Sequence, residues 1–103
     1  MPETRRVVWA PKALQDLRSV WRYYARVASP DIADSLLREI AQTAERLSAQ
    51  SLRGRARDEL NPGLRSVLAH PYTIFYRVRN GTVEIVRVLH ERRNFPAFFS
   101  KGE

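Results

Sequence analysis

The sequence predicts an α+β fold, in which an N-terminal strand and a helical hairpin pack on a small, mainly antiparallel β-sheet. Apolar residues recur at spacings of three and four from residue 11 to residue 49, which is typical of amphipathic helices. β-branched and aromatic residues dominate from residue 64 to residue 90, broken by turn residues, which is typical of strands. Because 103 residues suffice for one domain, we expect a single domain over 1–103, with 91–103 as a basic, aromatic tail.

The first half of the chain predicts one strand and two helices. Residues 4–10 are rich in β-branched residues and predict the first strand. Pro11 fits the first turn of a helix over 11–27. Ser29 then predicts the N-cap of a second helix over about 30–49. Because the connection between the two helices is so short, they must lie nearly antiparallel and form a hairpin.

The second half predicts a loop followed by three strands. Residues 50–63 are polar and contain arginine, glycine and proline, which is typical of a loop. Strands are expected over 64–69, 72–79 and 82–90. Asn80-Gly81 between the last two strands is the strongest local signal for a hairpin, because a type I′ turn needs a positive φ at both central positions.

This turn fixes the register of the hairpin and therefore its two faces. The expected pairs are Arg79–Thr82, Val78–Val83, Arg77–Glu84 and Tyr76–Ile85, with Arg77 and Glu84 forming a favourable cross-strand charge pair. The face expected beneath the helices carries Tyr72, Ile74, Tyr76, Val78, Val83, Ile85, Arg87 and Leu89. The face expected to be open to a partner carries Thr73, Phe75, Arg77, Arg79, Glu84, Val86, Val88 and His90.

Two features of this arrangement need a partner. Arg87 is charged on an otherwise apolar face, so it needs an acid such as Asp16, Asp34, Glu39 or Glu45, or else lies at the sheet margin and meets another protein. The tail carries phenylalanines at 95, 98 and 99, which are too many to leave in water. They pack back on the sheet or wait for a partner.

Composition limits the classes of protein to consider. The net charge of +7 indicates an acidic partner, either a nucleic acid or an acidic protein segment. Lys12 and Lys101 are the only lysines among 18 basic residues, so arginine, whose planar group suits carboxylates and phosphates, dominates. The chain has no cysteine and two histidines, so we expect no disulfide, no metal and no cofactor. With no membrane-length apolar run and no signal-peptide pattern at residues 1–4, we expect a cytoplasmic protein without membrane contact.

Several motifs resemble those of the RelE/ParE toxin superfamily, and of its ParE branch in particular. Residues 11–17, followed by Trp21-Arg22-Tyr23-Tyr24, are similar to the opening helix of ParE toxins. Pro62-Gly63-Leu64-Arg65-Ser66, followed by residues 72–78 (YTIFYRV), is similar to a ParE pattern of the form GLRS and Y-x-IFYRV. Residues 83–90 are similar to the last ParE strand. The motifs span residues 7–93, so the chain is identified as a ParE-type toxin.

The resemblance implies a toxin of a type II toxin–antitoxin system. ParE-like members inhibit DNA gyrase and trap it on cleaved DNA, whereas RelE-like members cleave mRNA on the ribosome. We expect a gyrase inhibitor without catalysis of its own, held in a hetero-oligomer by a ParD-like antitoxin that supplies any sequence-specific DNA binding. A ribosome-dependent mRNA endonuclease is the alternative, and a repressor module without a strong target is a third possibility.

The resemblance also suggests which residues meet each partner. The residues expected to bind the antitoxin are Leu17, Trp21, Tyr24, Arg87 and Phe98. The residues expected to face the target are Arg55, Arg57, Arg65, Arg92 and Arg93. The partner antitoxin is expected to offer an amphipathic helix and an acidic extended stretch.

The groups that RelE-type nucleases use are largely missing. Thr73 stands where those enzymes place an arginine, and Phe98 and Phe99 stand where they place a tyrosine. No catalytic residue is therefore expected. If the nuclease alternative holds, His90 would act with Arg65 and Arg93, because imidazole suits acid–base catalysis. Otherwise His90 is a strand-end residue that organises the tail.

Overall fold

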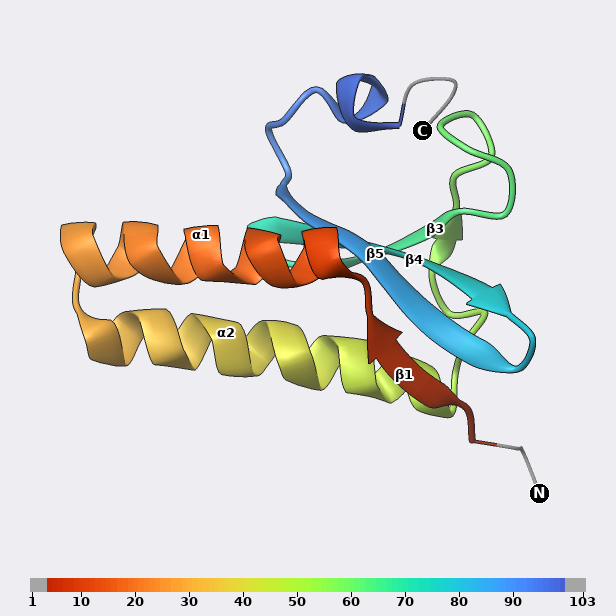
Figure 1. The fold of residues 1–103 in the computed structure, drawn as a ribbon, viewed down its shortest axis with the longest axis horizontal. Helices are drawn as coiled ribbons and strands as arrows, with labels where there is room; N and C mark the ends of the chain where they lie inside the picture. The colour runs from red at the N-terminus through yellow and green to blue at the C-terminus, as the bar shows by residue number, and fades with distance from the viewer. Residues whose placement is uncertain (1–3, 100–103) are drawn as a thin grey trace.

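Two helices cover one face of a five-stranded sheet in the computed structural model, which describes residues 4–99 (Figure 1). The first half contains β1 (Arg6–Trp9), α1 (Pro11–Val27), α2 (Pro30–Glu45) and the 3₁₀ helix η1 (Arg46–Ser48). The second half contains β2 (Arg55–Ala56), β3 (Arg65–Ala69), β4 (Tyr72–Arg79), β5 (Thr82–His90) and the 3₁₀ helix η2 (Phe95–Phe98). The predicted α+β architecture is confirmed.

The sheet is mixed, with the order β1-β5-β4-β3-β2. β1 runs parallel to β5, and the other neighbours are antiparallel. β1 pairs with β5 only from Thr82 to Ile85. The second half of β5 therefore has no strand on that side, and α1 packs against it instead.

The helical hairpin forms for the reasons read from the sequence. Pro11 opens α1, and Ser29 caps α2 by accepting a hydrogen bond from the amide of Ile32 at 3.1 Å. The helix predicted to reach residue 49 ends at Glu45 and tightens into η1, which still buries Leu47. The main core between helices and sheet contains Ala13, Val20, Ile40, Ala44, Leu47, Tyr72, Ile74, Tyr76, Val83, Ile85 and Val88.

The β4–β5 hairpin follows the predicted register only as far as Tyr76. Asn80 and Gly81 both have positive φ, 52° and 73°, as a type I′ turn requires. Beyond the predicted pairs, a β-bulge intervenes, because Phe75 lies opposite Arg87 while Tyr76 lies opposite Ile85. Val86 is thus an extra residue in β5.

The bulge makes part of the predicted face assignment wrong. Every residue of β5 after Val86 changes face, because side chains alternate along a strand. Arg87 and Leu89 therefore lie on the side of Phe75, while Val88 enters the core beneath the helices. His90, predicted on the open face, is turned toward Tyr72, with ring centroids 5.3 Å apart.

The tail folds back onto the sheet face that was predicted to be open. Phe99 is buried in a second cluster with Leu64, Phe75 and Leu89. Phe95 and Phe98 pack against the same cluster. Residues 100–103 of the predicted tail lie outside the described residues. The phenylalanines are therefore satisfied within the chain.

The polar loop before β3 contains a strand that the sequence did not predict. β2 pairs Arg55 with Ser66 on β3. The expected charge pair between Arg77 and Glu84 keeps its register, but Arg77 turns away and donates a hydrogen bond to Asn61 Oδ1 at 3.1 Å. Within residues 4–99, no helix is long and apolar enough to cross a membrane.

Candidate functional site

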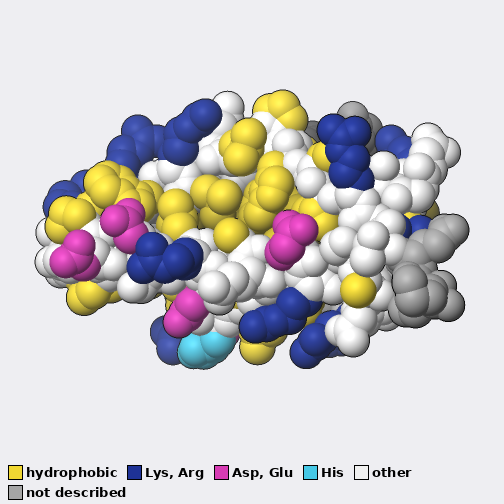
Figure 2. Space-filling model, turned by 90° about the horizontal axis from the view of Figure 1, so that it is seen from below, with side chains coloured by type: hydrophobic (Ala, Val, Ile, Leu, Met, Phe, Trp, Pro, Cys, Tyr) yellow, Lys and Arg dark blue, Asp and Glu magenta, His cyan; other side chains and the backbone are white. Residues whose placement is uncertain are grey.

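The outer side of the helical hairpin carries an apolar groove, here called the helical groove. Its apolar lining comes from Leu14, Leu17, Trp21 and Leu37. The three α1 positions share one side because residues three and four apart are neighbours on a helix. Leu14 is 40% exposed. Seen from the side of α2, hydrophobic side chains gather in a band along the molecule (Figure 2).

Polar groups frame the helical groove and fix its shape. The indole Nε1 of Trp21 donates to Asp34 Oδ1 at 2.8 Å, which ties α1 to α2. Arg18 and Arg22 line the groove from α1. An apolar floor with arginines at its margin fits an amphipathic helix whose polar face is acidic.

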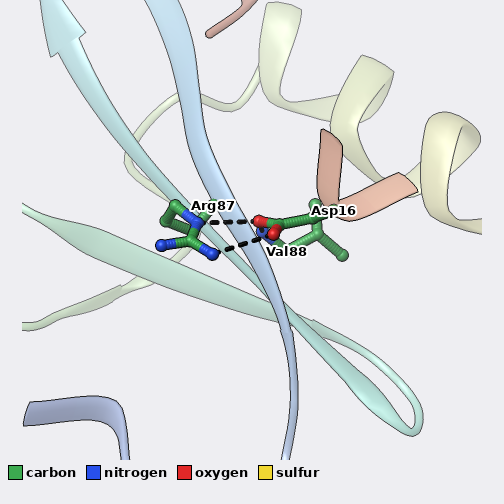
Figure 3. A network of polar contacts seen from close by, with 3 residues as sticks. All are labelled: Asp16, Arg87 and Val88. Carbon is green, nitrogen blue, oxygen red and sulfur yellow. Dashed lines mark hydrogen bonds and ion pairs between the residues drawn. The ribbon is translucent and has the colours of Figure 1, made fainter. Parts of the chain in front are cut away.

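An ion pair joins α1 to the second half of β5 (Figure 3). Arg87 donates from Nε and Nη2 to the two carboxylate oxygens of Asp16, at 2.8 Å each. The amide of Val88 donates to the same carboxylate at 2.9 Å. Asp16 thus accepts hydrogen bonds from the guanidinium group of Arg87 and from a backbone amide on the edge of β5 that β1 does not cover. Of the acids considered for Arg87, Asp16 is the partner.

A cavity of about 540 Å³ lies between α1, the end of β5 and the tail, and we call it the His90 cavity. Tyr24, Tyr72, His90 and Arg93 line it. Burial, and after it a hydrogen bond with Tyr24, raises the pKa of the Tyr72 hydroxyl far above its usual value. The Nδ1 atom of His90 accepts a hydrogen bond from the amide of Arg92 at 3.1 Å. This contact places the proton of a neutral His90 on Nε2.

Arginine–aromatic contacts hold the tail on the sheet. The guanidinium of Arg57 lies 6.0 Å from the ring centroid of Phe75 and 5.7 Å from that of Phe95. The ring of Phe98 contacts two guanidinium groups, those of Arg87 at 5.0 Å and Arg93 at 4.8 Å. Such contacts are worth about 0.5–2 kcal/mol each, so they anchor the tail together with its buried phenylalanine.

The arginines predicted to face the target divide into two groups. Arg55, Arg92 and Arg93 are exposed, and the guanidinium of Arg93 also stacks on Phe98. Arg57 is committed to the tail and donates to Ser66 Oγ at 2.8 Å. Arg65 donates to the carbonyl of Gly54 at 2.6 Å. The last two side chains therefore serve the fold of the chain in this structure.

The residues predicted to bind the antitoxin also lie in separate places. Leu17 and Trp21 line the helical groove. Tyr24 lines the His90 cavity, and Phe98 lies in the tail. Arg87 lies between the last two places and is occupied by Asp16. These five residues thus lie on different sides of α1 and in the tail, and they do not form one continuous patch.

Of the three residues expected to act in a nuclease, the structure brings only two together. His90 and Arg93 line the same cavity, which also holds the hydroxyl of Tyr72. Arg65 does not line that cavity, because β3 and the Gly54 carbonyl hold it elsewhere. No cluster of potential metal ligands occurs in the part of the chain that the structure describes.

Sequence reasoning missed the role of Gly54. A Cβ added at Gly54 would lie 2.5 Å from the Tyr76 hydroxyl and 2.7 Å from the Ser66 carbonyl oxygen. Tyr76 accepts a hydrogen bond from the Gly54 amide at 2.8 Å and donates to the Ser51 carbonyl at 2.9 Å. The composition of residues 50–63 predicts a loop but does not indicate that Gly54 is needed for close packing against Tyr76 and Ser66.

Comparison with known proteins identifies one family. Residues 7–95 match the sequence model of the family described as the ParE toxin of type II toxin–antitoxin system, parDE. The chain is 39% identical over 88 residues to Toxin ParE1 of Mycobacterium tuberculosis, covering 84% of this chain and 90% of that protein. It is 36% identical over 87 residues to Toxin RelE2 of Caulobacter vibrioides, covering 84% and 96%. A structure from the chromosomal ParDE system of P. aeruginosa has the same fold, with a TM-score of 0.76 at 22% identity over 84% of this chain and 96% of that one.

Proposed function

The chain belongs to the ParE toxin family of type II toxin–antitoxin systems, and from this premise we propose that it inhibits DNA gyrase without catalysis of its own and is neutralised by a ParD-like antitoxin. The identification made from the sequence motifs is confirmed at the level of the family. The proposal adds the target, the mode of action and the class of antitoxin.

The arrangement of the tail supports a binding role over a catalytic one. Arg92 and Arg93 are exposed on a segment that the buried Phe99 and arginine stacking on Phe98 hold in one position. A preorganised basic surface loses little conformational entropy when it meets an acidic target. In the same segment Phe98 and Phe99 have no proton to transfer, so these two positions offer contact surface and no acid–base group.

A supercoiling assay tests the gyrase proposal. Purified gyrase, relaxed plasmid and ATP are incubated with the chain, alone and with its antitoxin. We expect loss of supercoiling with accumulated cleaved DNA, and recovery when antitoxin is added. Replacing Arg92 and Arg93 by glutamate should abolish inhibition, whereas Arg38→Glu, at an exposed position on α2, should not. Unimpaired supercoiling by folded, growth-toxic protein would refute the proposal.

We further propose that the helical groove receives an amphipathic helix of the antitoxin. The groove offers an apolar floor formed by Leu14, Leu17 and Trp21, with arginines at its margin. Neutralisation requires tight binding, so we expect nanomolar affinity, about −12 kcal/mol. Leu14→Asp should weaken antitoxin binding strongly, because it places a charge in the buried interface. Leu68→Asp changes a leucine that is 58% exposed on β3, away from the groove, and serves as the matched control.

One observation favours a second candidate function, ribosome-dependent mRNA cleavage. The His90 cavity brings an imidazole together with Arg93 and the hydroxyls of Tyr24 and Tyr72, which are groups that can bind phosphate and transfer protons. Primer extension on mRNA after a short induction tests this function. Cleavage within translated codons that His90→Gln abolishes would establish the nuclease, and uncut transcripts from growth-arrested cells would exclude it.

A further inference from the structure

A third hollow lies on the sheet face opposite the helices, and we call it the sheet groove. It has a volume of about 300 Å³ and is bounded by the start of α1, the β4–β5 hairpin and the tail. Figure 1 shows the tail and the loop before β3 on the side of the sheet away from α2. The charged and polar residues that line the sheet groove are Lys12, Asn61, Arg77, Arg79, Glu84 and Arg87. Because Asp16 already pairs with Arg87, the positive potential of the lining comes mainly from Arg77 and Arg79, with Glu84 as the anion among the lining residues.

Arg77 has an unfilled hydrogen-bonding position in this groove. Its Nη2 donates to Asn61 Oδ1 at 3.1 Å. Its Nε is shielded from solvent and has no acceptor among the described residues. Glu84 lies directly across the hairpin, yet no ion pair joins it to Arg77. A buried N–H without an acceptor is destabilising, so an anion that enters the groove and supplies an acceptor to Nε would bind more tightly.

The start of α1 adds a second source of positive potential. Ala10, the residue before the helix, has no side chain that could accept a hydrogen bond from the first turn. The first turn contains no acidic residue. The partial positive charge at the start of this long helix therefore remains uncompensated by its own residues, beside Arg77 and Arg79. Phosphate combines well with both a helix start and arginine, because its oxygens accept from backbone amides and from the planar guanidinium.

We propose that the sheet groove binds a backbone phosphate of duplex DNA, without reading its sequence. Proteins that grip single strands combine a basic groove with open aromatic faces on which bases stack. No such face is available here, because Phe98 already contacts two guanidinium groups and Phe99 is buried. A duplex keeps its bases stacked inside and presents phosphates, which is what the lining of this groove can recognise.

Fluorescence anisotropy with a short labelled duplex tests this proposal on the full chain alone. We expect Arg77→Gln and Arg79→Gln each to weaken binding equally for unrelated sequences and to reduce the slope of log K against log salt by about 1. Arg38→Gln on α2 removes the same charge far from the groove and should leave both quantities nearly unchanged. Since gyrase is absent, the result is independent of the gyrase proposal.

A second variant distinguishes a local site from the effect of net charge. Asn61→Asp keeps the shape of the side chain and places a carboxylate beside Arg77, so it should abolish duplex binding while thermal unfolding stays cooperative. If Arg77→Gln fails to fold, Arg79→Gln tests the proposal in its place, because Arg79 is exposed and its replacement should not disturb the fold. Equal losses for Arg38→Gln and Arg79→Gln would overturn the proposal. It would also be overturned if the groove variants affected binding of polyglutamate or single strands but not of duplex DNA.

Discussion

Asp16 and Arg87 form a two-bond ion pair that joins α1 to the part of β5 beyond the end of β1. The bulge at Val86 is what turns Arg87 toward this edge. Asp16 also accepts a hydrogen bond from the backbone amide of Val88. The carboxylate thus provides the acceptor that a neighbouring strand would have given to the Val88 amide. It also neutralises the charge of Arg87.

The first prediction follows from this double role. Asp16→Asn should lower the free energy of unfolding by about 3 kcal/mol, the lower end of the range for broken buried pairs. The lower end applies because the two side chains keep 14% and 16% exposure. Urea denaturation measures the change, and Glu39→Gln on the exposed side of α2 is the control, expected within about 0.5 kcal/mol of wild type. Equal stability of the two variants would contradict the role assigned to Asp16.

The second prediction concerns Gly54. Gly54→Ala should destabilise the fold by more than about 2 kcal/mol, because the added methyl group meets the Tyr76 hydroxyl and the Ser66 carbonyl. Gly63→Ala provides the comparison, since a Cβ there meets nothing within 4 Å and only the φ of +79° is unfavourable. That strain costs about 1 kcal/mol. Thermal unfolding of both variants tests which one is less stable. A larger loss of stability for Gly63→Ala than for Gly54→Ala would refute the packing argument.

Local signals explain why most of the fold could be predicted. Pro11, Ser29 and the Asn80-Gly81 turn act through their own backbone geometry, so the starts of the helices and the hairpin register next to the turn follow from short stretches of sequence. The apolar stripe of each helix likewise depends on spacing alone.

The parts that could not be predicted depend on contacts distant in sequence. No residue near Val86 signals the bulge in the sequence, yet the bulge moves Arg87 and His90 to the opposite faces of the sheet. The pair between residues 16 and 87, and the stacking of Arg57 on the tail, join segments far apart in the chain. The side-chain contacts of individual residues were therefore predicted less well than the secondary structure.

The third prediction uses the pKa of Tyr72, which burial raises in the folded state. An unfolded tyrosine ionises near pH 10, so Tyr72 contributes its full stability below about pH 10. Above that pH the unfolded chain loses the proton first, and the free energy of unfolding falls as pH rises. Tyr72→Phe cannot ionise and should lose less stability between about pH 8 and pH 11 than wild type. Urea denaturation of both proteins at the two pH values measures this difference, and equal losses would contradict the role assigned to Tyr72.

The last prediction separates two roles for Arg57, which was expected from sequence to face the target. In the structure its guanidinium lies beside Phe75 and Phe95 and binds Ser66, which makes it a positioning residue for the tail. Arg57→Lys keeps the positive charge but loses the planar group, so it should release the tail. We expect chymotrypsin to cleave the tail faster and gyrase inhibition to fall, whereas Arg55→Lys, at an exposed neighbouring position, changes neither. Full inhibition with an unprotected tail would show that the position of the tail does not matter to the target.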